Sequence, residues 1–178
     1  MYNSFSPATL FTQLKRKVFI SYHHKDQSWV DSFRTTFSDG FDLFTDCSLD
    51  EAIDSNSLLY INRTIREDYI TGSSVTIVIC GADTWRRKCV DWEIYSTLDK
   101  DHALLGVTLP HNREWRNGQQ IRVVPDRLHK NIEAGYAHWV DWPLDVQSLK
   151  NAIEHSLNLS NLNKQQKNNS ATKMARNL

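Results

Sequence analysis

The chain has 178 residues, enough for one domain with a hydrophobic core and too few for two comfortable ones. Its 21 lysines and arginines balance its 21 aspartates and glutamates. This balance argues against a protein that binds nucleic acid or an anionic membrane surface through its net charge. Basic residues do gather locally, because residues 160–178 contain four of them and no acid.

The sequence has no targeting or membrane-spanning signal. No apolar run approaches the ~20 residues that span a bilayer, and residues 1–17 lack the basic start and apolar stretch of a secretory signal. We therefore expect a cytoplasmic protein. Its three cysteines, Cys47, Cys80 and Cys89, are odd in number and form no CxxC pair, so reduced thiols are expected instead of a disulfide framework or a zinc site.

Three regions are expected along the chain: an N-terminal extension over residues 1–16, a folded domain over 17–159, and a basic tail over 160–178. The extension has apolar residues at a spacing that suits a short helix. The domain alternates short runs of β-branched and aromatic residues with segments that have apolar residues every three or four positions. In chain order this pattern predicts a strand at 17–22, a helix at 27–37, a strand at 41–45, a helix at 58–69, a strand at 75–80, a helix at 90–98, a strand at 104–109, a short helix at 126–132, a strand at 137–140 and a helix at 146–157. The tail is rich in Asn, Gln, Ser and Lys, and its composition predicts disorder.

Alternating strands and helices predict an α/β fold. We expect a flavodoxin-like three-layer sandwich with a five-stranded parallel sheet in the order 2-1-3-4-5, joined by right-handed crossovers. In that order the connections change direction between the first and third strands, and a ligand crevice opens at the carboxyl ends of those strands. The loops after Tyr22 and after Cys80 border this crevice.

Glu93 is the candidate catalytic residue. It follows Val90 by three residues and precedes Thr97 by four, which places it beside the buried stripe of a predicted helix. A carboxylate there is partly desolvated, so either its pKa is raised or nearby donors hold it. It could bind sugar hydroxyls and stabilise a cationic sugar as a leaving group departs. Spacing alone favours the simpler alternative, an ion-pair partner at a helix edge.

Aromatic residues flank this acid. Trp85 and Trp92 could stack on a ribose or a nucleobase, although tryptophans more often fill a core. The loop at residues 21–26 adds hydroxyl, imidazole and carboxylate groups at the mouth of the crevice. Within it, Asp26 is expected to have the simpler role of capping the next helix.

Several other chemistries are excluded. His23 and His24 are adjacent, so they point apart, and no third ligand has a suitable spacing; no metal site is expected. The chain has no GxGxxG, GxxxxGK[ST] or GxSxG motif. A phospho-acceptor receiver domain would need an aspartate at the end of the third strand, where this chain has Cys80 and Gly81.

Four segments together resemble the TIR domain superfamily, and in particular the stand-alone TIR-like proteins of the bacterial Thoeris anti-phage system, the ThsB group. They are FISYHHKD at 19–26, FTDCSLDEAID at 44–54, TIVICGADTW at 76–85 and CVDWEI at 89–94. The resemblance extends over about 17–159. Ordinary TIR domains place a tryptophan directly before the cysteine and the glutamate three residues further on. Here Cys89 and Glu93 are four apart and Trp92 precedes Glu93, which favours the prokaryotic branch.

The resemblance implies an enzyme that consumes NAD as its substrate and needs no cofactor. Glu93 matches the family's catalytic glutamate, which engages the nicotinamide ribose while the nicotinamide bond breaks through an oxocarbenium-like state. Water or a hydroxyl then captures the ADP-ribosyl cation. The Thoeris product would be similar to a cyclic ADP-ribose isomer or an ADP-ribose conjugate, and it would activate a separate effector protein.

The resemblance also implies a pocket. Ser21, Tyr22 and His23 would line the NAD pocket beside Asp46 and Trp85, and Trp92 is added to this set because it flanks Glu93 in the sequence. We also hypothesise that the loop at 46–54 is where a neighbouring subunit of a homo-oligomer completes the pocket. Two rival hypotheses remain open. The domain could be a TIR interaction module in which Glu93 is structural, or a relative of the nucleoside N-glycosidases and deoxyribosyltransferases, which share the topology and the crevice carboxylate.

Overall fold

The computed structural model describes residues 15–45 and 70–178, and its centre is a parallel sheet of five strands. The strand order is β2-β1-β3-β4-β7. Because β5 and β6 form a separate sheet, β7 is the fifth strand of the parallel sheet along the chain, and the predicted order 2-1-3-4-5 is confirmed. The strands are β1 (Arg16–Ser21), β2 (Phe41–Thr45), β3 (Val75–Cys80), β4 (Ala103–Thr108) and β7 (His138–Asp141).

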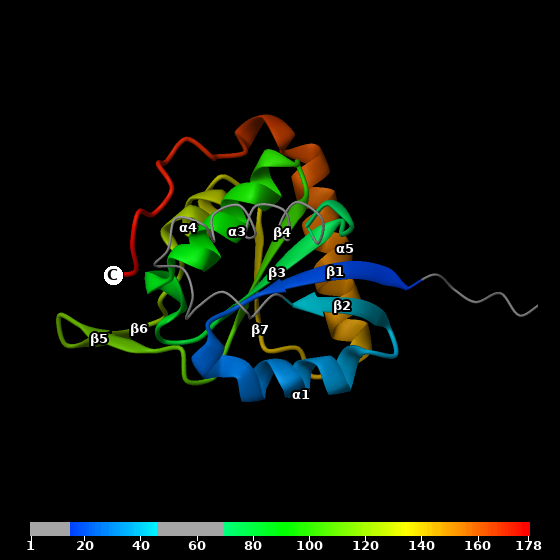
Figure 1. The fold of residues 1–178 in the computed structure, drawn as a ribbon, viewed down its shortest axis with the longest axis horizontal. Coiled ribbons are helices and arrows are strands. Elements are labelled where there is room, and N and C mark those ends of the chain that lie inside the picture. The colour runs from blue at the N-terminus through cyan, green and yellow to red at the C-terminus, as the bar shows by residue number, and fades with distance from the viewer. Residues whose placement is uncertain (1–14, 46–69) are drawn as a thin grey trace, which may run out of the picture.

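Helices cover both faces of the sheet, as expected for an α/β sandwich (Figure 1). One hydrophobic core joins the sheet to α1 (Gln27–Phe37) and α5 (Val146–Leu162). The other joins it to α3 (Lys88–Asp99) and α4 (Asp126–Glu133). The predicted helix at 58–69 lies outside the described residues. Within the two described ranges, no helix combines the length and apolarity needed to cross a membrane.

The central strands are buried because their sequence is apolar on both faces. All six residues of β3 are buried, and Ile77 and Ile79 contribute to the α1 side while Val78 and Cys80 contribute to the α3 side. This alternation follows from the two-residue period of a strand.

Asp145 caps α5 as predicted, since its side chain accepts the amide N–H of Ser148 at 2.7 Å.

The region at 110–135 contains a hairpin that was not predicted. Strands β5 (Glu114–Arg116) and β6 (Gln119–Ile121) are antiparallel and are joined by Asn117 and Gly118, both with positive φ, of 50° and 76°. Asn-Gly is the preferred pair for such a two-residue turn, because glycine and asparagine tolerate the left-handed region.

The expectation of a disordered tail at 160–178 is wrong. Helix α5 continues to Leu162, a short 3-10 helix follows at Lys164–Gln166, and the remaining residues run back toward α3 and α4 (red in Figure 1). This segment is held by hydrogen bonds and not by a hydrophobic core, as described below.

Candidate active site

Glu93 lies where α3 packs against the sheet. It is 3% exposed, and the Ser21 hydroxyl donates a 2.6 Å hydrogen bond to its Oε2. Ser21 is the last residue of β1, so this bond joins the carboxyl end of that strand to the helix that follows β3. One turn further along α3, the Thr97 hydroxyl is 2.6 Å from the hydroxyl of Thr76 on β3. Helix α3 is therefore attached to two neighbouring strands by buried polar contacts.

The setting of Glu93 suits stabilisation of a positive charge. Because little water reaches the carboxylate, a cation that developed beside it would be stabilised far more than at a hydrated surface. The hydroxyl of Ser21 orients the carboxylate without neutralising it. This meets the expectation that donors hold Glu93. Within residues 15–45 and 70–178, no group of three His, Cys, Asp or Glu side chains could hold a metal ion.

Asp26, in the loop that follows β1, contacts the loops that follow β3 and β4. The expected capping role is wrong, because in the described part of the chain its side chain makes no capping bond to α1. Instead Oδ1 is 3.1 Å from Nε2 of His111, and Oδ2 accepts a 3.4 Å bond from the Thr84 hydroxyl. The carboxylate also lies over Gly81, where a Cβ would come within 2.2 Å of Oδ2. Burial, and then the charge of Asp26, raises the pKa of the Cys80 thiol, which therefore stays protonated.

The predicted pocket residues at the end of β1 lie on two faces of the sheet. Tyr22 packs in the core on the α1 side, and its hydroxyl donates to Oε1 of Gln27 at 2.5 Å, whereas Ser21 faces α3. His23 is 1% exposed, and its ring lies edge-on to that of His24 with centroids 4.3 Å apart. Asp46 lies outside the described residues.

A family model described as the TIR-like domain of the Thoeris protein ThsB matches residues 19–114, just over half of the chain. The chain belongs to this family. The matched segment begins within β1, includes both Ser21 and Glu93, and ends at the start of β5. No curated protein sequence matches the chain significantly.

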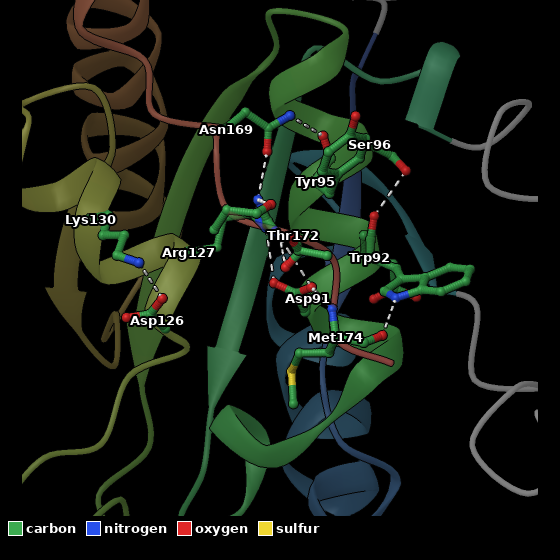
Figure 2. A network of polar contacts seen from close by, with 12 residues as sticks. Asp91, Trp92, Tyr95, Ser96, Asp126, Arg127, Lys130, Asn169, Thr172 and Met174 are labelled. Atoms are coloured by element: carbon green, nitrogen blue, oxygen red, sulfur yellow. Dashed lines mark hydrogen bonds and ion pairs between the residues drawn. The ribbon is translucent and has the colours of Figure 1, made fainter. Parts of the chain in front are cut away.

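In this ThsB-type TIR-like domain the two tryptophans predicted to line the NAD pocket, Trp85 and Trp92, lie toward the C-terminal segment. The indole N–H of Trp92 donates to the carbonyl of Met174 at 2.8 Å (Figure 2). Successive helical residues point about 100° apart, so Trp92 and its neighbour Glu93 face different surroundings. Trp85 has the guanidinium of Arg86 4.6 Å from its ring centroid, and it lines a cavity of about 450 Å³ that Met174 also borders. The indole N–H of Trp92 is thus directed at the C-terminal segment.

Sequence reasoning missed one buried ion pair on the same helix. Asp91, two residues before Glu93, pairs with Arg127 of α4, with Nε 2.9 Å from Oδ1. The side chain of Arg127 is only 2% exposed. The only signal in the sequence was an acid in the first turn of the predicted helix, a position that acids favour in most helices.

Proposed function

We propose that this Thoeris TIR-like protein cleaves NAD in bacterial anti-phage defence. It would release nicotinamide and convert the remainder into a cyclic ADP-ribose-type signal that activates a separate effector protein. The observation that supports this best is the buried Glu93 carboxylate, hydrogen-bonded by Ser21 at the carboxyl edge of the sheet. Membership in the ThsB family makes NAD the first substrate to test.

In the proposed reaction Glu93 binds the hydroxyls of the nicotinamide ribose. The bond between the sugar's anomeric carbon and the pyridinium nitrogen breaks, and its electron pair leaves with neutral nicotinamide. The sugar becomes an oxocarbenium-like cation, which the negative charge of Glu93 stabilises. Attack by water, with loss of a proton, gives ADP-ribose. Attack by a nucleophilic atom of the same molecule, with loss of its proton when it carries one, gives a cyclic product.

Ser21 has a supporting role in this reaction. Its hydroxyl fixes one carboxylate oxygen of Glu93 at 2.6 Å, so the carboxylate does not have to reorganise as the sugar cation forms. The contact of Thr97 with Thr76 steadies the same helix one turn further along. Both contacts place the charge before the substrate binds, which is the usual way in which enzymes stabilise charge in a transition state.

The experiment compares nicotinamide release by wild-type protein and by Glu93→Gln, followed by HPLC with NAD as substrate. Glutamine keeps the shape and hydrogen-bonding capacity of the side chain and removes its charge. We expect release to fall by about 100-fold or more. Glu133→Gln is the matched control, because Glu133 is a carboxylate at the exposed end of α4 and should leave activity unchanged.

Mass spectrometry of the same reactions identifies the product, since a cyclic isomer lacks the water that ADP-ribose has gained. The assay is run with purified protein and with extracts of phage-infected cells that express it, because the reaction could need a trigger. Equal release by wild type and Glu93→Gln would refute the assignment of Glu93. No nicotinamide in either preparation would refute NAD cleavage and favour an interaction module.

A further inference from the structure

The C-terminal residues 167–178, here called the strap, lie along α3 from one end to the other. At the end of the helix, the ammonium of Lys167 donates to the carbonyl of Leu98 at 2.7 Å. At its start, Oδ1 of Asn177 accepts the amide N–H of Lys88 at 2.8 Å. The cap position of α3 is Arg87, whose side chain has only donors, so Asn177 satisfies an amide that the cap residue cannot. The strap thus completes both ends of the helix.

The middle of the strap lies against Arg127 (Figure 2). The guanidinium of Arg127 has five N–H groups and donates with all of them. Two donate to the carboxylate of Asp91, at 2.9 and 3.3 Å. The other three go to the strap: to Oδ1 of Asn169 at 3.0 Å, to the carbonyl of Ala171 at 3.0 Å and to the carbonyl of Thr172 at 3.2 Å. A guanidinium this deeply buried needs all of these acceptors, because an unpaired buried donor is costly.

Asp91 connects this network to the active-site helix. Its Oδ2 also accepts the amide N–H of Met174 at 2.8 Å, and the carbonyl of Met174 accepts the indole N–H of Trp92 at 2.8 Å. Asp91 and Trp92 directly precede Glu93. The strap therefore holds the turn of α3 that presents the proposed catalytic carboxylate, on a side of the helix other than the one held by Ser21.

The strap is anchored to α4 as well. Asn131 of α4 forms a reciprocal pair with Asn168, donating to its carbonyl at 2.7 Å and accepting its amide N–H at 2.9 Å. The strap is bound to α3 and α4 by directional hydrogen bonds. Such contacts fix a position more sharply than apolar burial does, because a hydrogen bond weakens steeply when its length or angle changes.

We propose that the strap, through Asp91 and Arg127, positions α3 and sets the location of the Glu93 carboxylate in the active site. Asp91 and Arg127 are positioning residues, and the backbone of residues 167–178 acts on α3 through them, although the strap lies outside the matched family segment. The catalytic part of this inference rests on the proposed function. A displacement of 1 Å at a catalytic group can cost about 100-fold in rate, so a loosened helix is expected to lower kcat.

The test replaces one backbone donor of the strap in the full-length protein. Met174→Pro removes the N–H that Asp91 accepts, and Met174→Ala is the control that keeps it. Hydrogen exchange followed by mass spectrometry reports on α3 without requiring activity. We expect the amides of α3 to exchange about tenfold faster in Met174→Pro, while those of β3 and β4 change less than about twofold. Met174→Ala should resemble wild type.

Kinetics with NAD provide the second measurement. In Met174→Pro we expect kcat to fall by about tenfold with KM changed less than about threefold, because the substrate still binds while the carboxylate is misplaced. Arg127→Lys, which keeps the charge and loses the forked geometry, should act in the same direction. The global fold is checked by circular dichroism.

The outcomes separate the two proposals. Unchanged exchange in α3 of Met174→Pro overturns the strap's role, whether or not the protein cleaves NAD. Faster exchange with unchanged kcat, in a wild type that cleaves NAD, overturns the link to catalysis. Faster exchange in a protein that never cleaves NAD supports the strap's hold on α3 and refutes the proposed function instead.

Discussion

Gly81 is the position where the structure predicts the sharpest response to a small change. It follows β3, and the buried carboxylate of Asp26 lies directly over its Cα. In Gly81→Ala the new Cβ would be 2.2 Å from Oδ2 and 2.7 Å from both Cγ and Oδ1 of Asp26. Real Cβ contacts are never that short, so the carboxylate must move. It would then lose its contacts with His111 and Thr84.

The cost can be estimated from these contacts. Overpacking a close-packed site costs about 1–3 kcal/mol, and leaving a buried polar group without its partner costs about 1–3 kcal/mol more. Because the side chain can relax in part, we expect Gly81→Ala to lower the free energy of unfolding by about 2–4 kcal/mol. For a domain of this size that corresponds to a fall in Tm of roughly 5–15 °C.

A double-mutant cycle measured by urea unfolding tests the cause. In the Asp26→Ala background the carboxylate is absent, so Gly81→Ala should cost little, or stabilise by about 0.4–1 kcal/mol through the lower entropy of the unfolded chain. A coupling energy of at least about 1.5 kcal/mol between the two sites is expected. An equal cost in both backgrounds would show that the clash with Asp26 is not what makes glycine necessary.

Two further predictions concern the start of α3 and two partly buried histidines. Asn177→Ala should lower the free energy of unfolding by about 1 kcal/mol, because it removes the acceptor of the Lys88 amide. Asn177→Asp should retain stability, since a carboxylate accepts the same bond at the positive end of the helix. Urea unfolding of both variants checks this, and equal losses of stability would contradict it. Burial lowers the pKa of His102 and of His138 below the ordinary value near 6.5. The unfolded chain therefore binds more protons just below pH 6.5, so stability should be complete above that pH and fall as the pH drops from 6.5 toward the lowered values. Urea midpoints between pH 7.5 and 5.5 measure the slope, and a midpoint that rises on acidification would exclude this mechanism.

Periodicity in the sequence was sufficient to predict the sheet. Alternating strands and helices led to the correct strand order, and the apolar run of β3 marked a strand buried on both faces. The spacing of Glu93 between Val90 and Thr97 placed the carboxylate at the buried side of α3. The burial of β3 and the direction of Glu93 are local features, since a side chain's direction follows from its position in a helix or strand. The turn at residues 117–118 is equally local, because an Asn-Gly pair by itself favours a two-residue hairpin turn.

Polar partners across the fold could not be predicted in the same way. Asp26 had the residue type and position of a helix cap, yet its carboxylate is bound by His111, 85 residues away. Trp92 stood next to Glu93 in the sequence, yet it contacts Met174. In each case two roles were chemically possible, and the packing of distant loops decided between them.

The strap shows most clearly what the sequence by itself determined and what the tertiary structure decided. Composition correctly indicated that residues 160–178 have few apolar side chains to bury, and the inference of disorder followed from that. The segment is ordered because its backbone carbonyls and amides satisfy Arg127 and Asp91, which lie on two different helices. Backbone hydrogen-bonding groups are the same at nearly every residue, so a sequence does not show which of them a buried charge will bind; only the folded arrangement of α3 and α4 selects them.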